Sequence, residues 1–323
     1  MKGNDKLKLE KVAIVAKLHA KEASSVVRTL VKWLGERGID TVLEASLAKR
    51  RRGSVSFTLE TLPRDLSLVI VLGGDGTLLS VARAMGGKQI PILGVNLGSL
   101  GFLTDIALQD LYETLDSVLS GEATIDSRMM LRAELLRKDH TLASEVVLND
   151  VVITKGAIAR IIEVGVEIDQ QFVAMIRADG LIVSSPTGST AYSLAAGGPI
   201  LHPNLDAMIL TPICPHTLTY RPVVVSNEAK VELTLRGDSG EVYVTFDGQT
   251  SQPMEPGDVV RVRQSRHQVK LVSPPGKNYF QVLRHKLRWA ERPRSRRTML
   301  TSRRGGRSGG VPLLDLGSQL RLA

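Results

Sequence analysis

An apolar run followed by closely spaced glycines constrains the fold of this chain more than any other stretch. Val69–Leu72 is entirely apolar, as is typical of a parallel strand that is buried on both faces of an α/β sheet. It leads into Gly73–Thr77, with the sequence Gly-Gly-Asp-Gly-Thr, and we expect a helix that begins at Leu78 with Thr77 as its N-cap. Open α/β sheets bind their ligands at such strand-to-helix turns.

The residues of this turn suit an anionic ligand. Glycine lacks the Cβ atom that keeps a phosphate away from the backbone, and the N–H groups at a helix start attract an anion. A carboxylate such as Asp75 repels a phosphate unless a metal ion lies between them or the carboxylate takes a proton from an attacking hydroxyl. Asp75 therefore favours phosphoryl transfer. A tight turn with a solvated aspartate would give the same short pattern, so the prediction needs support from the rest of the chain.

Length and composition indicate a protein with two cores. The chain has 323 residues, 43% of them hydrophobic, and a single cysteine, Cys214, which we expect to be a small buried residue. One cysteine excludes an internal disulfide framework and favours the cytoplasm. No apolar stretch approaches the ~18 residues of a membrane helix, and the first residues lack the apolar core of a signal peptide. We therefore expect a cytoplasmic protein without a membrane partner.

Most of the positive charge lies at the C-terminal end. The formal net charge is +9, and residues 291–323 contain eight arginines and two acidic residues, a net charge of +6. This segment is rich in Arg, Ser and Gly and has little to bury, so we predict that it is a disordered tail. The rest of the chain is only weakly basic, which argues against a specific nucleic-acid partner.

Strand and helix patterns alternate over residues 1–127. We expect strands at 11–17, 41–44, 69–72 and 91–96, and helices at 24–36, 78–85 and 108–119. The segment Leu97–Asp105 is a second glycine-bearing loop that follows a strand, so the two glycine loops should share one crevice. This pattern predicts a Rossmann-like α/β domain.

Residues 128–276 are rich in short alternating strands. We expect strands at 129–136, 144–154, 160–168, 172–176, 181–184, 223–225, 231–235, 242–246, 259–262 and 269–272. They predict a second, all-β domain of stacked antiparallel sheets, a β-sandwich, with one helix at 190–196. A last helix within 277–290 should pack back onto the first domain.

Several segments of the β-rich part, together with the two glycine loops, resemble the bacterial NAD kinase family. They are Leu148-Asn149-Asp150, Arg177-Ala178-Asp179-Gly180, the segment Ser185–Pro199 that contains Thr-Gly-Ser-Thr-Ala-Tyr-Ser, and Phe246-Asp247-Gly248-Gln249. The resemblance runs in order from about Val12 to Trp289. It implies phosphorylation of the adenosine-ribose 2′-hydroxyl of NAD by ATP to give NADP, with Asp75 as proton acceptor.

The resemblance also implies contacts with NAD. These fall on Asp75, Gly76, Asn149, Asp150, Arg160, Arg177, Asp179, Thr190, Ala191, Tyr192, Ser193, Leu194, Ala195 and Gln249. Residue chemistry adds Thr187, because its hydroxyl, like those of Thr190 and Tyr192, can bind adenine edges and ribose oxygens. Two simpler interpretations stay open: turn capping by Ser185, Thr187 and Ser189, and an ion pair between Arg177 and Asp179.

Cofactor and partners follow from the same resemblance. We expect Mg²⁺ to arrive with ATP, because no cluster of His and Cys has the spacing of a metal site. The chain has no Gly-x-x-x-x-Gly-Lys-Ser/Thr loop, so it is not a Walker-type ATPase. The family resemblance implies a homodimer or homotetramer that associates through the β-rich domain.

Two rival functions remain at this point. Lipid and sphingoid kinases share the Gly-Gly-Asp-Gly-Thr loop, but they should offer an apolar slot where this chain has the polar segment from Thr187 to Tyr192. A nucleotide-binding sensor without catalysis would not need Asp75. Both features favour a kinase that acts on a nucleotide.

Overall fold

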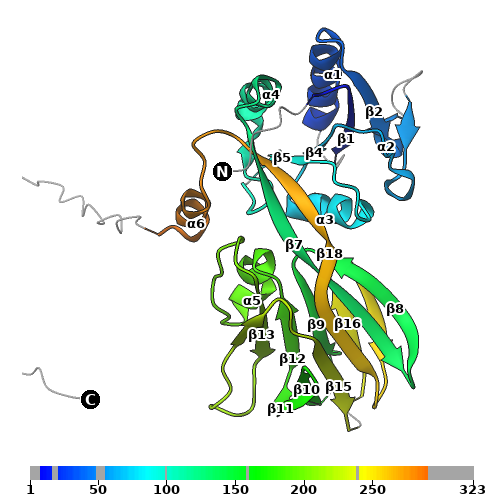
Figure 1. The fold of residues 1–323 in the computed structure, drawn as a ribbon, viewed down its shortest axis with the longest axis vertical. Helices are drawn as coiled ribbons and strands as arrows, with labels where there is room; N and C mark the ends of the chain where they lie inside the picture. Colours follow the sequence, from blue (N-terminus) through cyan, green and yellow to red (C-terminus); the bar gives the residue numbers. More distant parts are fainter. Residues whose placement is uncertain are drawn as a thin grey trace, which may run out of the picture. The chain divides into compact units, whose positions relative to one another are not determined.

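Two β-sheets form the framework of the described residues, as Figure 1 shows. One sheet has 12 strands and is mixed, and the other has six antiparallel strands. The computed structural model describes residues 8–16, 21–48, 55–98, 100–157, 160–237 and 240–289. The predicted disordered tail, residues 291–323, lies outside them.

The N-terminal part is the predicted α/β arrangement. Its parallel strands lie in the order β5-β4-β1-β2-β3, with β6 beside β5. The strands are β1 (Lys11–Ala16), β2 (Asp40–Glu44), β3 (Ser56–Phe57), β4 (Leu68–Leu72), β5 (Ile92–Asn96) and β6 (Ile106–Ala107). The helices are α1 (Lys21–Gly35), α2 (Ala45–Ala48), α3 (Asp75–Ala84) and α4 (Leu111–Ser120), and 3₁₀ turns lie at Leu59–Thr61 and Leu108–Asp110.

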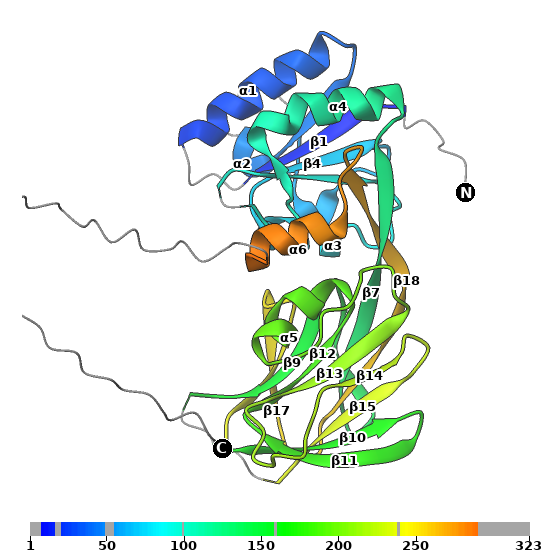
Figure 2. The same ribbon diagram turned by 90° about the vertical axis from the view of Figure 1, so that its left-hand side faces the viewer.

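Strand β4 is buried on both faces, as its apolar run predicts. Ile70 and Leu72 belong to the core that also contains residues of α1 and α4, whereas Val69 and Val71 belong to the core that contains residues of α3. Figure 2 shows α1 and α4 on one face of the sheet and α3 on the other. Because β4 packs into a core on each face, the position of the glycine turn that follows it is fixed.

The start of α3 differs from the prediction. The helix begins at Asp75 with Gly74 as its N-cap, three residues before the predicted start at Leu78. Thr77 is not the cap, because it lies inside the first turn, where its hydroxyl fills the space that a Cβ atom on Gly73 would need. A side chain at position 73 would therefore crowd Thr77.

The larger sheet continues from the α/β part into the β-rich part through two long strands. They are β18 (Val259–Ser273) and β7 (Thr124–Arg137), and β18 pairs with β5 at Leu271↔Ile92. The strands predicted at 259–262 and 269–272 are thus one strand. Their polar spacer Ser265–His267 is a bulge opposite Met130 and not a turn. The predicted domain boundary at residue 127 lies inside β7 and stays a prediction.

The remaining strands form the predicted stacked antiparallel sheets. The larger sheet adds β8 (His140–Val147), β10 (Ile162–Ile168), β11 (Gln171–Ala178) and β15 (Val231–Arg236). The smaller sheet has β9 (Asp150–Lys155), β12 (Gly180–Ser184), β13 (Ala207–Ile213), β14 (Val223–Ser226), β16 (Val242–Phe246) and β17 (Thr250–Met254). Leu131 and Leu233 from one sheet share a core with Ile153 and Val244 from the other.

Three details of the β-rich part depart from the sequence predictions. The strand predicted at 144–154 is two strands in different sheets, β8 and β9, which meet at Leu148-Asn149. The helix predicted at 190–196 is a 3₁₀ turn, Thr187–Thr190, followed by the short α5 (Tyr192–Ala195). Strands β13 and β17 had no strong sequence signal, since each contains a proline.

Two further observations concern residues outside the sheets. Cys214 is exposed, with a backbone φ of 45°, so the prediction of a buried cysteine is wrong. The last described helix is α6 (Tyr279–Leu287), which begins after the N-cap Asn278. Among the described residues, no helix has the length and apolar character that crossing a membrane requires.

Candidate functional site

The carboxylate of Asp75 is held by the second glycine loop. Its Oδ1 atom accepts hydrogen bonds from the backbone N–H groups of Leu103 (3.1 Å) and Thr104 (2.9 Å) and from the Thr104 hydroxyl (2.9 Å). Its Oδ2 atom accepts one bond, from the N–H of Phe102 at 2.9 Å. The two glycine loops therefore meet, as predicted, and the alternative of a merely solvated aspartate is wrong.

Close packing at Gly101 explains the glycine in this loop. A Cβ atom at position 101 would lie 2.0 Å from Oδ1 of Asp75, which no real contact allows. Asn96 at the end of β5 steadies the loop, because its Nδ2 donates to the Thr104 hydroxyl (3.1 Å) and its Oδ1 accepts from the N–H of Gly98 (2.5 Å). Asp75 thus has a fixed orientation.

The number of donors on each oxygen shows which one can still react. A carboxylate offers about two lone-pair positions on each oxygen. Oδ1 of Asp75 already accepts three hydrogen bonds, and Oδ2 accepts one. Oδ2 therefore keeps a position that can accept a proton from a bound hydroxyl.

The turn between β8 and β9 is organised by Asp247, a residue for which we predicted no role. Its carboxylate accepts the N–H groups of Leu148 (2.8 Å), Asn149 (2.7 Å) and Asp150 (3.1 Å). Asp247 is buried, which raises the pKa of its carboxyl, and the three N–H groups oppose that rise. The only sequence signal for Asp247 was its position in the motif Phe-Asp-Gly-Gln, which also contains the predicted site residue Gln249.

Asp150 lies buried next to this carboxylate. Burial raises the pKa of Asp150 to about 7, the charge of Asp247 adds to the rise, and the backbone N–H of Tyr192 partly opposes it. Near neutral pH the Asp150 carboxyl can therefore either donate or accept a hydrogen bond. The raised pKa also makes stability depend on pH.

We expect the Asp150→Asn substitution to stabilise the protein increasingly as the pH rises. The folded protein holds the Asp150 proton up to about pH 7, whereas the unfolded chain loses it near the ordinary pKa of 3.8. Between these values the folded state binds more protons, so the stability of the wild-type protein falls with increasing pH. Urea unfolding should show a stability difference that grows from pH 4 to 7 and is constant above; a difference independent of pH would contradict this.

The segment Thr187–Ala195 packs against the same turn. The N–H of Ser185 donates to the carbonyl of Asn149 (2.9 Å), and a Cβ atom on Gly188 would lie 2.2 Å from that carbonyl oxygen. Ser185 and Ser189 donate their hydroxyls to backbone carbonyls, which supports turn capping for these two residues. The buried hydroxyl of Thr187 has no hydrogen-bond partner among the described residues. A buried unpaired hydroxyl is unfavourable, so Thr187 fits a residue that binds a polar ligand.

Gln249 connects the residues around Asn149 to the glycine turn that contains Asp75. Its Oε1 accepts the hydroxyl of Ser80 (2.7 Å), and its Nε2 lies 3.4 Å from the carbonyl oxygen of Gly76. Within the segment 247–249, Asp247 thus binds the backbone of Asn149, and Gln249 contacts Gly76. The structure therefore connects the predicted residues Asp75, Gly76, Asn149, Asp150, Thr187, Thr190, Ala191, Tyr192, Ser193, Leu194, Ala195 and Gln249.

Three predicted site residues lie apart from this group. Arg177 and Asp179 come just before Gly180, where β12 begins, and Arg160 comes just before β10, whose Ile162 pairs with Ala178. Asp150 pairs with Ser184 at the other end of β12. At about 3.3 Å per residue, five residues of strand correspond to roughly 17 Å. Asp179 pairs with Lys155 (2.8 Å) and Arg177 with Glu163 (3.1 Å). The alternative of an ion pair between Arg177 and Asp179 is therefore wrong.

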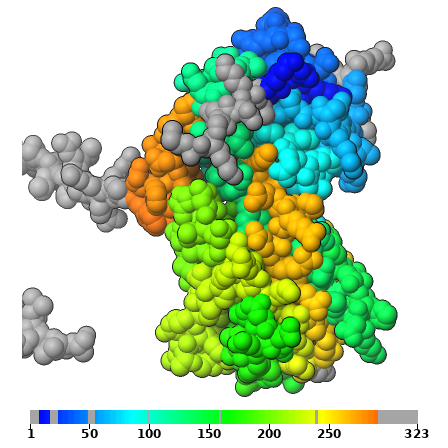
Figure 3. Space-filling model, in the orientation of Figure 1, coloured from blue at the N-terminus to red at the C-terminus, as the bar shows by residue number. Residues whose placement is uncertain are grey.

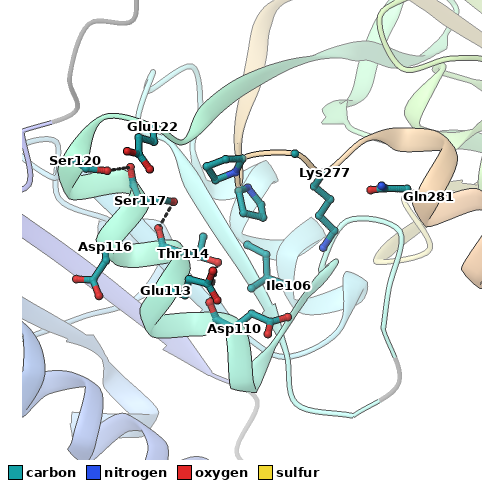
Figure 4. Close-up of a pocket in the computed structure, with 13 residues that line it drawn as sticks. Ile106, Asp110, Glu113, Thr114, Asp116, Ser117, Ser120, Glu122, Lys277 and Gln281 are labelled. Carbon is teal, nitrogen blue, oxygen red and sulfur yellow. Dashed lines mark hydrogen bonds between the residues drawn. The ribbon is translucent and has the colours of Figure 1, made fainter.

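A pocket of about 790 Å³ elsewhere in the protein contains none of the predicted residues. It lies between α4 and the segment before α6, and Figure 4 shows Asp110 and Glu113 on one side of it, Lys277 on the other and Asp116 pointing away. A second pocket, of about 520 Å³, includes Ser80 and Gln249 of the candidate site. In the described ranges no three or more His, Cys, Asp and Glu side chains gather as a metal site.

Comparison with protein families and curated proteins gives a consistent result. The model of the ATP-NAD kinase N-terminal domain matches residues 12–123, and that of the ATP-NAD kinase C-terminal domain matches residues 148–273. The NAD kinase of Geotalea daltonii is 48% identical over 284 residues, which is 88% of this chain and 100% of the relative. The NAD kinase of Geobacter sulfurreducens is 49% identical over 284 residues, with the same coverage.

Solved structures share the fold. A crystal structure of yeast NADH kinase complexed with NADH has a TM-score of 0.80 at 24% identity and covers 89% of this chain and 90% of its own. A crystal structure of an NAD kinase from Archaeoglobus fulgidus in complex with ATP has a TM-score of 0.67 at 25% identity and covers 86% and 98%. The combination of an α/β part and a β-rich part is therefore found in both.

Proposed function

The chain belongs to the ATP-NAD kinase family, and we propose that Asp75 is the general base with which it phosphorylates NAD to NADP with ATP. The observation that carries this proposal is the geometry of the Asp75 carboxylate: Oδ1 is fully engaged by the N–H groups of Leu103 and Thr104 and by the Thr104 hydroxyl, and Oδ2 is open to one more hydrogen bond. A fixed base at the edge of a glycine turn suits a hydroxyl that approaches a phosphate.

The proposed reaction balances as a simple transfer. The 2′-oxygen of the adenosine ribose forms a bond to the γ-phosphorus of ATP, and the bond from that phosphorus to the β–γ bridging oxygen breaks. The hydroxyl proton moves to Oδ2 of Asp75, and ADP leaves. A ribose hydroxyl is far too weak an acid to ionise at neutral pH, so a carboxylate in hydrogen-bond reach is needed as the new bond forms.

The residues around Asn149 are proposed to bind the nucleotide. Asn149 offers both donors and an acceptor, Asp150 can be either donor or acceptor near pH 7, and Thr187 has a buried hydroxyl in need of a partner. These are the groups that adenine edges and ribose oxygens require. They also argue against an apolar lipid chain as the substrate, since the lipid would leave them unpaired.

Mg²⁺ is proposed to come with ATP. Magnesium keeps most of its waters and is held mainly by substrate phosphates with one or two carboxylates. The glycine turn at the start of α3 offers backbone N–H groups that favour the phosphate oxygens that would carry the ion, and Asp75 stays free to accept the proton. Bound there, the ion would neutralise the charge that develops on the phosphate oxygens.

Ligand-linked melting tests the proposed substrate class. NAD and NADP should raise the melting temperature by an amount that grows with the logarithm of ligand concentration, and sphingosine should not. The physical reason is the polar lining of the Asn149 and Thr187 segments. A shift with sphingosine and none with NAD or NADP would contradict the proposal.

We further propose that the chain forms a homodimer or homotetramer through its β-rich part. Strand β11 is an edge strand of the larger sheet, and its residues Phe172, Val173 and Met175 are exposed. Exposed apolar residues on an edge are typical of an interface.

We expect Phe172→Asp to dissociate the oligomer. A charge in place of this exposed ring would oppose burial of the β11 edge. Light scattering should give the mass of one chain for this variant and a multiple for the wild type. Leu142→Asp is the matched control, because Leu142 is a similarly exposed apolar residue on β8; dissociation by the control alone, or a monomeric wild type, would contradict the proposed interface.

A further inference from the structure

Helix α6 contacts both halves of the candidate site. Figures 1 and 2 both place it between the α/β part and the short helix α5. In the space-filling view the orange atoms of α6 adjoin the light-green atoms of the segment around α5 (Figure 3). The helix is about 180 residues distant in sequence from the loop that holds Asp75, so its contacts there depend on the complete fold.

Lys286 of α6 contacts the loop that carries the donors to Asp75. Its Nζ donates to the carbonyl oxygen of Leu100 at 2.5 Å and lies 5.5 Å from the centroid of the Phe102 ring. A cation at this distance from an aromatic face is attracted to it. Phe102 is also the residue whose N–H donates to Oδ2 of Asp75, the oxygen proposed to take the proton.

Lys277, just before α6, holds the other end of the same loop. It donates to the backbone carbonyl of Asp105, and its Nζ lies 3.3 Å from the Asp105 carboxylate. Burial raises the pKa of Asp105, and the charge of Lys277 opposes that rise. The loop from Leu100 to Asp105 is therefore attached by a lysine near each end.

The first turn of α6 contacts residues 201 and 202, which follow the proposed nucleotide-binding segment Thr187–Ala195 (the nucleotide segment). The Tyr279 hydroxyl donates to the carbonyl oxygen of Leu201 at 3.2 Å, and its ring lies 5.2 Å from that of His202. Leu201 is bonded in turn to Ser189, since its N–H donates to the Ser189 hydroxyl at 3.0 Å. One helix thus connects the Asp75 loop to the segment that contains Thr187.

We propose, on the basis of the role proposed above for Asp75, that Lys286 is a positioning residue for catalysis. Its amino group fixes the carbonyl of Leu100 and the ring of Phe102, and these fix the Phe102 N–H group that donates to Oδ2 of Asp75. Tyr279 has the corresponding role for the nucleotide segment. The two residues act on different steps, so their loss separates catalysis from binding.

The test compares three variants of the full-length enzyme. Lys286→Met keeps the length of the apolar stem and removes the donor, and we expect kcat to fall about 10- to 100-fold, as for a misplaced catalytic group. The KM for NAD should stay within about threefold of the wild-type value, because the binding residues are untouched. Lys286→Arg should restore most of kcat, and Arg284→Ala, which removes an exposed cation of the same helix, should leave it unchanged.

Two more measurements separate positioning from a merely structural role. Tyr279→Phe should raise the KM for NAD and leave kcat near the wild-type value. The effects on kcat of Lys286→Met and of Thr104→Val, which removes a donor to Asp75, should be non-additive if both act through one loop. Additive effects, or a normal kcat in Lys286→Met, would overturn the inference.

The same assays distinguish a failure of this inference from a failure of the proposed function. If Asp75→Asn loses catalysis and Lys286→Met does not, only the role of Lys286 is wrong. If Asp75→Asn keeps catalysis, the proposed base is wrong. A loss of activity in Lys286→Met that Lys286→Arg does not recover, with lowered thermal stability, would make α6 a structural element alone.

Discussion

The kcat of the Asp75→Asn variant should be about 10²- to 10⁴-fold below that of the wild-type enzyme, the usual effect of losing a general base. Asparagine has the size of aspartate, but its side chain cannot take the ribose proton. Its oxygen can still accept the bonds from Leu103 and Thr104, and only the Phe102 N–H loses its acceptor, so most of the contacts that hold the loop remain. Steady-state kinetics with Mg-ATP and NAD measure the change.

Nucleotide binding should survive the same substitution. NAD recognition is proposed to be spread over Asn149, Thr187 and Tyr192, so calorimetry should find a dissociation constant for NAD within a few-fold of the wild-type value. Asp65→Asn is the control, because Asp65 is an exposed carboxylate that pairs with Lys11 on the surface. Normal catalysis in Asp75→Asn would make Asp75 a structural residue, and normal chemistry with lost affinity would make it a ribose anchor.

The Asp247→Ala variant should be destabilised by on the order of 3 kcal/mol, because it leaves three backbone N–H groups without their acceptor. Each unpaired buried donor costs about 1–3 kcal/mol, and water at the half-buried Asn149 reduces the sum. Urea unfolding at pH 7 measures the change. We also expect weaker NAD binding, since the turn that presents Asn149 loses its support.

Two further variants serve as controls for the predicted destabilisation by Asp247→Ala. Asp206→Ala is the control for loss of a carboxylate, because Asp206 is exposed and accepts a side-chain bond from Asn227. Asp247→Asn keeps one acceptor oxygen and should lie between the wild type and Asp247→Ala. If Asp247→Ala were as stable as the control, Asp247 would not organise the turn between β8 and β9.

Local sequence signals predicted the elements that hold the Asp75 turn. The apolar run Val69–Leu72 is long enough to show burial on both faces, and the glycines mark where backbone and ligand must come close. The helix start was placed three residues late because Thr77 is a good N-cap residue by type, whereas packing against Gly73 decides its position. The contact between Thr77 and Gly73 therefore outweighed the preference of threonine for the N-cap position.

Local sequence patterns could not predict the contacts between distant parts of the chain. Nothing local in Gln-Ser-Arg-His shows that residues 265–267 are a bulge in one long strand, since the partner strand β7 lies more than 120 residues earlier. The roles of Asp247 and Lys286 also depend on partners about 100 and 186 residues away. The wide separation of Arg177 from Asn149 likewise follows from the pairing of β12 with β9.

A phosphoryl-transfer assay with the purified protein tests the proposed activity and the role of Asp75 most directly. Mg-ATP is supplied with NAD, and NADP is detected by an NADP-specific dehydrogenase; a parallel reaction replaces NAD with sphingosine and detects ADP. We expect NADP formation that depends on ATP and on Asp75, and no ADP formation above background with sphingosine. Phosphorylation of sphingosine without NADP formation, or NADP formation at an unchanged rate in Asp75→Asn, would contradict it.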